Sequence, residues 1–150
     1  MHKGSRHLGF TLVELVTVMA AVAVLVAAAT PSFRAHALRS NRTVGKLALV
    51  DLASRQENFR ADRRAYARTL TALGLVGDTV FVSRSGELLA ADTPAAAYRV
   101  TLASASDNSF EVVAAPVNMQ AADVRCGELS LKSDGGRGAS GTDGVACWQK

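Results

Sequence analysis

GFTLVEL, residues 9–15, begins the apolar run that decides the fold of this 150-residue chain. The run is FTLVELVTVMAAVAVLVAAA, from Phe10 to Ala29, and its single charged residue is Glu14. Twenty residues of helix are about 30 Å long, which matches the hydrocarbon core of a bilayer. The run therefore predicts a membrane-spanning helix that keeps a carboxylate near its start.

Three interpretations of the run are open on these residues alone. A secretory signal peptide would explain the basic residues before the run and the cleavage-like AAA at 27–29, but its apolar segment is usually shorter. A plain membrane anchor would place Glu14 near one interface, within reach of water. A chain cut after Gly9 would begin with the cationic amine of Phe10, one helical turn from Glu14.

The third interpretation gives the carboxylate a function in assembly. An unpaired carboxylate in lipid costs a few kcal/mol, so a cationic partner is expected. When such helices pack side by side, the Phe10 amine of one pairs with Glu14 of its neighbour, and a carboxylate in the first turn also complements the helix dipole. The pair would form only when the subunit is docked in the correct register.

The rest of the chain predicts a helix followed by a sheet. Residues 34–66 are amphipathic and would continue the first helix beyond Pro31, where proline can kink or interrupt it. Gly45 in this segment is either a weak point, costing about 1 kcal/mol against Ala, or a site of close packing. The candidate strands are 79–83 with 87–91, 97–103 with 110–116, and 126–132. We expect an α+β fold in which the long helix packs on an antiparallel sheet of about four strands.

Two cysteines, Cys126 and Cys147, enclose a glycine-rich segment near the C-terminus. In an oxidising compartment a disulfide is the default expectation, and closing a loop of this size contributes about 3 kcal/mol. Two free thiols are the alternative, since a zinc site needs more ligands than two cysteines provide. Trp148 would either anchor a partner at the rim of this loop or close the core of the sheet.

The sequence predicts a protein that is not an enzyme and needs no cofactor or metal. Its histidines are His2, His7 and His36, and no nucleophile–base pair or phosphate-binding loop accompanies them. Asp134 and Asp143 are too few acids for a calcium site.

The N-terminus resembles the class III signal and first helix of type IV pilins. The shared features are a short basic leader, the glycine at 9, the Phe-Thr-Leu that follows it, the Glu-Leu at 14–15 and the proline at 31. The segments ADVRCGELSLKSDGGR and ACW near the C-terminus, and RQENF at 55–59, resemble a subgroup of minor pilins. The resemblance implies cleavage between Gly9 and Phe10, N-methylation of Phe10, and a role of Glu14 in methylation or assembly.

The resemblance also implies a function: a minor pilin subunit of a type IV pilus, supporting pilus biogenesis, twitching motility or adhesion. Its parts would be a cleaved leader (1–9), a transmembrane and filament-core helix (10–30), and a globular pilin head (31–150) with a Cys126–Cys147 disulfide. Its partners would be other pilins, the prepilin peptidase and the inner-membrane assembly platform. The chain would cross the bacterial inner membrane once, with its head in the periplasm, and then join an extracellular pilus.

Two alternative functions concern related filaments. A type II secretion pseudopilin would share the N-terminus, but the terminal cysteine pair and the closing Cys-Trp suit pilins better. A DNA-uptake pilin is suggested by a basic run beside two aromatic residues. Its candidate phosphate contacts are Arg60, Arg63, Arg64 and Arg68, close to Phe59 and Tyr66, with Arg137 in the loop. The net charge of +4 does not require this function, because a solvated helix end explains the same residues.

The basic residues around the run do not favour the orientation that the pilin resemblance implies. Two lie before it, and four follow within seventeen residues of Ala29. The four are Arg34, Arg39, Arg42 and Lys46. Under the positive-inside rule this excess would put the downstream side in the cytoplasm, unless some of these residues belong to the folded head.

Overall fold

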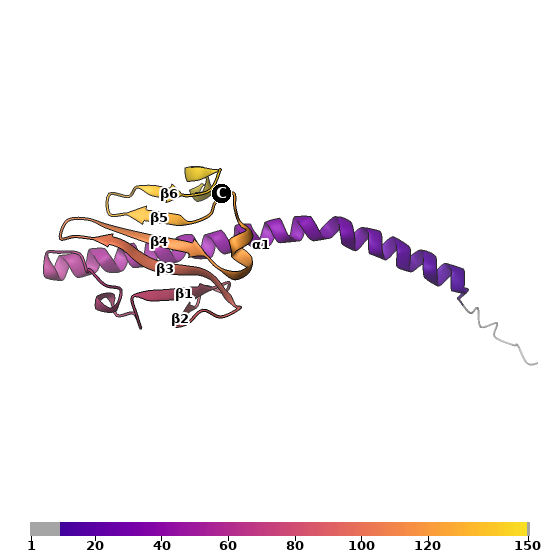
Figure 1. Ribbon diagram of the computed structural model, residues 1–150, viewed down its shortest axis with the longest axis horizontal. Coiled ribbons are helices and arrows are strands. Elements are labelled where there is room, and N and C mark those ends of the chain that lie inside the picture. The colour runs from indigo at the N-terminus through magenta and orange to yellow at the C-terminus, as the bar shows by residue number, and fades with distance from the viewer. Residues whose placement is uncertain (1–9, 150) are drawn as a thin grey trace, which may run out of the picture. The chain divides into compact units, whose positions relative to one another are not determined.

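The computed structural model describes residues 10–149, which form one long helix and an antiparallel sheet (Figure 1). The helix, α1, runs from Leu12 to Arg63 and is not interrupted at position 31. The chain divides into two compact units between Ala37 and Leu38, so the two halves of α1 belong to different units.

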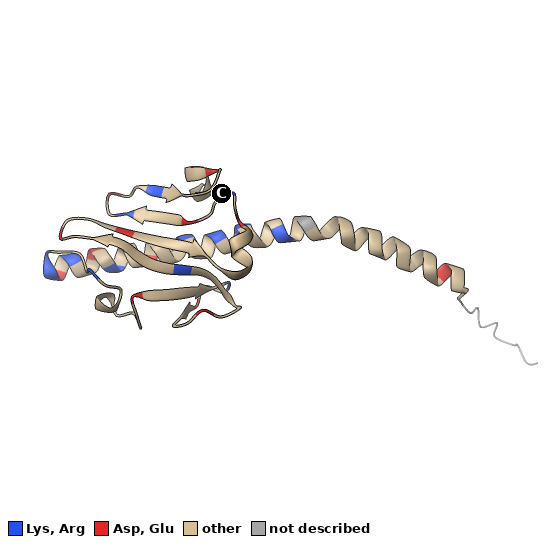
Figure 2. Cartoon of the chain, viewed as in Figure 1, with Lys and Arg blue, Asp and Glu red and all other residues tan. Residues whose placement is uncertain are grey.

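The first unit is the apolar half of α1, which Figure 2 shows almost free of charged residues. Its described large apolar side chains are exposed; Leu12, for example, is 79% exposed. By length and composition alone, this helix is able to cross a membrane. The hydroxyl of Thr17 donates to the Glu14 carbonyl (2.9 Å) and that of Thr30 to the Val26 carbonyl (2.7 Å). These polar groups are therefore satisfied without water, as a lipid environment requires.

The second unit is the head, in which the second half of α1 accompanies a six-stranded sheet of order β2-β1-β3-β4-β5-β6. Every neighbouring pair of strands is antiparallel. The strands are β1 (Thr79–Ser83), β2 (Leu88–Leu89), β3 (Ala96–Ala105), β4 (Phe110–Pro116), β5 (Leu129–Lys132) and β6 (Arg137–Ala139). Three short 3-10 helices complete it: η1 (Thr71–Leu73), η2 (Asn118–Ala122) and η3 (Gly144–Trp148).

The predicted α+β class is confirmed, but the expected number of about four strands is wrong, since the sheet has six. The strand that sequence reasoning missed is β6, because its residues lie in a glycine-rich segment that is typical of a loop. Gly138 lies opposite Ser130 on β5, and a Cβ at Gly138 would come 2.5 Å from the Ser130 hydroxyl oxygen. Glycine therefore permits close pairing here instead of preventing it.

The core lies between one face of α1 and the inner face of the sheet. Leu49, Leu52 and Gln56 from the helix are buried, as are Tyr98 and Val100 from β3. Gly45 belongs to the same helix face, and a Cβ there would lie 2.9–3.1 Å from the ring of Tyr98. The glycine is thus a site of close packing, which decides between the two interpretations of Gly45.

The segment after α1 is fixed to the helix by a buried glutamine. The side chain of Gln56 donates to the Ala67 carbonyl and accepts from the Ala67 N–H, both at 2.9 Å. Tyr66 and Leu70 on either side are buried in the core. The linker that precedes the sheet therefore follows a defined path along the helix.

Candidate functional site

The N-terminal end of α1 carries the residues for which the sequence predicts processing and assembly. Thr11 caps the helix, because its hydroxyl oxygen accepts the Glu14 N–H at 3.2 Å. The Thr-Leu-Val-Glu sequence has the spacing of a capping box, a signal that the sequence analysis did not use. Phe10 and Glu14 are exposed, and Gly9 lies outside the described residues. The described geometry thus presents a free carboxylate in the first turn of an apolar helix.

The head contains a buried ion pair between Arg42, in the second half of α1, and Asp123. The Arg42 guanidinium donates from Nε to Asp123 Oδ2 (2.5 Å) and from Nη2 to Oδ1 (2.7 Å). The two side chains are only 8% and 2% exposed. The bonds to Asp123 raise the pKa of Arg42 above its usual value, although burial opposes this. The pair joins α1 to the residues that follow η2.

A buried glutamine extends this ion pair into a network. Gln120 Oε1 accepts from Asn41 Nδ2 at 3.0 Å. Its Nε2 is within hydrogen-bond distance of Tyr98 OH (3.0 Å), the Leu38 carbonyl (3.2 Å) and Asp123 Oδ2 (3.2 Å). Among the described residues, every buried side-chain nitrogen and oxygen has a hydrogen-bond partner. The network is therefore fully paired, as a buried polar cluster must be to stabilise the fold.

Because Tyr98 is buried in this network, the free energy of unfolding is expected to depend on pH in the alkaline range. Its burial raises the pKa of the phenol far above its usual value, although the bond from Gln120 lowers it. An unfolded chain would release this proton near pH 10, whereas the folded chain keeps it. Folded protein thus binds more protons above about pH 10, so its free energy of unfolding falls as pH rises.

Tyr98→Phe is therefore expected to flatten the alkaline loss of stability, by up to about 1.4 kcal/mol per pH unit above about pH 10. Urea melts of the head from neutral to strongly alkaline pH would measure the slope. Burial also raises the pKa of Tyr66, so Tyr66→Phe serves as a comparison. Burial lowers the pKa of Lys46, which has the opposite effect on the pH dependence of stability. Because Lys46 is present in every variant, its effect cancels when their curves are compared. Parallel curves for wild type and Tyr98→Phe would contradict the assignment.

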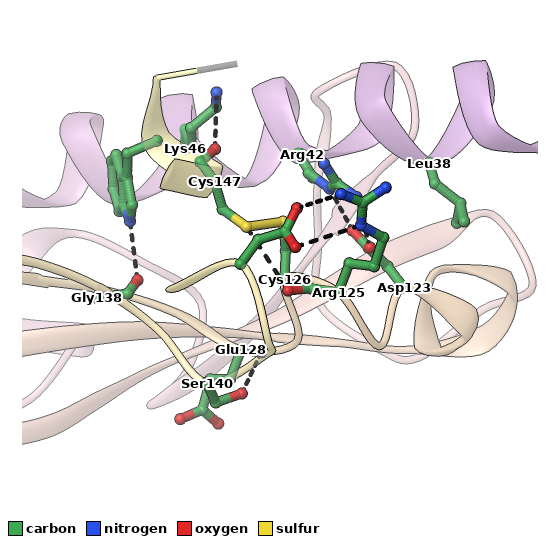
Figure 3. The surroundings of a disulfide bond; sticks show 12 residues. Leu38, Arg42, Lys46, Asp123, Arg125, Cys126, Glu128, Gly138, Ser140 and Cys147 are labelled. Carbon is green, nitrogen blue, oxygen red and sulfur yellow. Dashed lines mark hydrogen bonds and ion pairs between the residues drawn. A yellow bond between two sulfur atoms is a disulfide. The ribbon is translucent and has the colours of Figure 1, made fainter. Parts of the chain in front are cut away.

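The Cys126–Cys147 disulfide forms in the structure, with Cα atoms 5.8 Å apart and both side chains buried (Figure 3). The Cys147 carbonyl accepts from Lys46 Nζ on α1 at 3.5 Å. Trp148 is half-buried against the core, and its indole N–H donates to the Gly138 carbonyl at 2.8 Å. Of the two roles considered for Trp148, the structure favours closing the sheet, with Arg137 5.3 Å above its ring.

The four arginines predicted as DNA contacts lie at and just after the end of α1, and three of them have local partners. Arg60 donates to Tyr66 OH at 2.9 Å, and Arg63 lies 5.9 Å above the ring of Phe59. Arg68 pairs with Asp107 at 3.0 Å, with both side chains largely exposed. Arg60 and Arg64, with Glu57 and Ala61, line a shallow open depression of about 470 Å³. Such an exposed end is able to bind anions, and it also complements the helix dipole.

Two of the four basic residues downstream of the apolar run have partners inside the folded head. Arg42 is buried in its pair with Asp123, and Lys46 bonds to the carbonyl of Cys147. Both belong to the folded head, which the positive-inside count does not weigh as it weighs a short flank. The excess of charge against the pilin orientation is therefore smaller than the sequence indicates.

The long helix has an exposed apolar half, and its second half packs in the head on an antiparallel sheet whose end is closed by a disulfide. Together these features define the class of type IV pilins. Residues 4–30 match the prokaryotic N-terminal methylation motif, and residues 31–130 match the family described as type IV minor pilin ComP, DNA uptake sequence receptor. The second match covers two thirds of the chain. The chain belongs to this family of minor pilins.

The chain is also similar to two individual proteins. The chain is 38% identical over 69 residues to the type IV wide pilus major component PilA4 of Thermus thermophilus. That alignment covers 46% of this chain, which thus spans about half (53%) of the length of that relative. A solved type IV pilin from Shewanella oneidensis has 22% identity and a TM-score of 0.44, over 67% of this chain and 89% of that one.

The interactions that the sequence analysis missed are those of the buried network. Asn41 and Arg42 lie on the helix face that also carries Leu38, Gly45 and Leu49. Two polar residues at core spacing were the available signal, because a buried Arg requires a buried acid elsewhere in the chain.

Proposed function

We propose that the chain is made as a precursor, cut after Gly9, N-methylated on Phe10, and inserted into the pilus through the first half of α1. The chain is a minor pilin and assembles with other pilins, so this proposal concerns the steps of processing and insertion that lead to assembly. The observation that carries it is the exposed apolar half of α1 with one carboxylate in its first turn. Such a surface is stable only in lipid or against other helices.

The intact mass of the protein from cell membranes and from sheared filaments tests the proposal. The expected species runs from Phe10 to Lys150, about one methyl group heavier and about two hydrogens lighter than the reduced, unmethylated chain. A species that begins at Thr30 would show an ordinary signal peptide and overturn the proposal.

Glu14→Ala is expected to leave the head folded and to reduce the subunit in sheared filaments by about tenfold or more, because the amine of a neighbouring helix loses its partner. Quantitative immunoblots of filament and membrane fractions measure this. Val13→Ala, a nearby exposed position without charge, is the matched control and should assemble normally. Wild-type filament levels and a methylated N-terminus in Glu14→Ala would contradict the role of Glu14.

The proposed location before assembly is the bacterial inner membrane, with the head in the periplasm. The head contains a disulfide, which persists in an oxidising compartment. The proposed partners there are the prepilin peptidase and the membrane platform of the assembly machine. After assembly the pilus would serve twitching motility or adhesion.

A second function, capture of DNA, is favoured by one observation: the matched family is described as a DNA uptake sequence receptor. The arginines at the end of α1 are the candidate contacts. Arg68 and Asp107 form an exposed pair, which opens at little cost when a phosphate competes. Phe59 and Tyr66 lie directly under two of these guanidinium groups.

The soluble head, residues 34–150, is expected to bind duplex DNA at low salt and to release it as salt rises. Alanine at Arg60, Arg63, Arg64 and Arg68 together should lower the salt slope of log K by about 0.9 for each phosphate that is no longer bound. Arg99→Ala, an exposed arginine on β3, is the control. Absence of binding at low salt would exclude DNA capture by the head, and an unaltered quadruple variant would exclude this site.

A further inference from the structure

Met119 is the one methionine of the head, and a well-fixed turn presents its thioether to solvent. The residue lies in η2 and is 67% exposed. On one side, Asn118 has a positive φ of 51°, and its side-chain amide lies within hydrogen-bond distance of three oxygen atoms, at 2.9–3.2 Å. On the other side, Gln120 is 1% exposed in the buried network. The backbone around Met119 is thus held in place, and the sulfur stays at the surface.

A guanidinium group lies against this sulfur. Arg84, in the turn between β1 and β2, donates from Nη1 to the Met119 sulfur at 3.4 Å. Among the described residues, this sulfur accepts the one side-chain hydrogen bond that the Arg84 guanidinium donates. A thioether is a weak acceptor, so a strong, charged donor here faces a poor partner. A better acceptor at the same place would therefore strengthen the contact between the two turns.

The other sulfur atoms of the head are protected. Cys126 and Cys147 are 0% and 1% exposed and are already joined in the disulfide. The susceptibility of sulfur to oxidation follows its exposure. An oxidant dissolved in water therefore reaches Met119 before any other sulfur of the head.

We propose that Met119 is a reversible oxidation site whose sulfoxide is held by Arg84. The oxidant is a peroxide. A lone pair of the sulfur attacks one peroxide oxygen, the O–O bond breaks, and this oxygen passes its proton to the departing hydroxide, which leaves as water. The sulfur is oxidised by two electrons and the peroxide is reduced by two. The Arg84 guanidinium then donates a charge-assisted hydrogen bond to the sulfoxide oxygen, a stronger bond than the one to sulfur.

The new bond braces one edge of the sheet. β2 has two residues and pairs with β1 alone, so this hairpin is weakly held. η2 is bound to α1, because the Gln120 side chain donates to the Leu38 carbonyl at 3.2 Å. Oxidation thus ties the turn before β2 to a turn that is fixed on the helix. Methionine oxidation usually loosens a structure. Here we expect it to tighten the hairpin, an effect that goes beyond the proposed function and does not depend on it.

The test uses the full chain in detergent, treated with hydrogen peroxide and analysed by peptide mass and hydrogen exchange. One added oxygen is expected on Met119, at a rate within several-fold of that in the urea-unfolded chain. The amides of Gly86 and Glu87, which are hydrogen-bonded inside the turn, should then exchange several-fold more slowly. The amides of β6, at the opposite edge of the sheet, are the control and should not change. Methionine sulfoxide reductase should restore the original exchange rates.

Three variants isolate the bond. Arg84→Ala should still be oxidised at Met119, but without slower exchange in the turn. Met119→Gln places a carbonyl oxygen near the sulfoxide position and should slow exchange without any oxidant, whereas Met119→Leu should not. Oxidation of folded Met119 more than about tenfold slower than in the unfolded chain would overturn the site. Exchange that is unchanged or faster after oxidation, or slowing that persists in Arg84→Ala, would overturn the role of Arg84.

Discussion

Asp123→Ala is expected to lower the free energy of unfolding of the head by about 3–5 kcal/mol, which is the usual cost of leaving one member of a buried ion pair alone. The Arg42 guanidinium would keep its charge in a site that is 8% exposed, without the carboxylate that now accepts from Nε and Nη2. Gln120 would also lose one of the partners of its Nε2. Urea melts of residues 34–150, followed by the fluorescence of Trp148, measure the loss.

The chain supplies a matched control for this prediction. Arg68 and Asp107 form an Arg–Asp pair of similar length, 3.0 Å, with side chains 71% and 65% exposed. Because solvent screens that pair, Asp107→Ala should cost less than about 1 kcal/mol. The double variant Arg42→Met with Asp123→Leu removes both charges and should recover most of the loss. If Asp123→Ala is no more destabilising than Asp107→Ala, the buried pair does not contribute to holding the residues after η2 against α1.

Serine at both Cys126 and Cys147 is expected to lower the free energy of unfolding by about 3 kcal/mol, since the bridge closes a loop between residues 21 apart in the sequence. The loss should be concentrated in the segment that contains β6 and η3, which the bridge joins to the chain just before β5. Hydrogen exchange of the β6 amides would show this local loosening next to the global melt.

Reduction of the wild-type disulfide provides the control for the serine variant. Wild type in reducing agent should have the same melting midpoint as the double serine variant. Reducing agent should leave the melting midpoint of that variant unchanged. An identical melting midpoint for oxidised wild type and the variant would show that the bridge adds nothing to the stability of the head.

The parts of the fold that sequence predicted are those with a local signal. The apolar run from Phe10 to Ala29, the amphipathic pattern of residues 34–66 and the candidate strands at 97–103 and 110–116 were each identified without knowledge of their partners. The disulfide followed from the presence of only two cysteines and from the resemblance to minor pilins, and the structure confirms it.

The parts that sequence did not predict depend on distant partners. Asn41 and Arg42 meet residues 79 and 81 positions further along the chain, and on a helix such polar residues are usually solvated. Gly138 joins a strand only because Ser130 lies opposite it, so its own neighbours gave no strand signal. The sequence likewise gave no indication that Arg68 pairs with Asp107, 39 positions further along the chain.

The short covalent path between the disulfide and the ion pair has a mechanical consequence for a filament subunit. Cys126 lies three residues after Asp123, and the bridge ties it to Cys147 at the far end of the C-terminal loop. A pull on that loop is thus carried through the sulfur bridge and three residues to the guanidinium of Arg42 on α1. Since β5 and β6 lie between the two cysteines, tension applied at Cys147 reaches the helix by this covalent path in parallel with the pairing of β5 to β4.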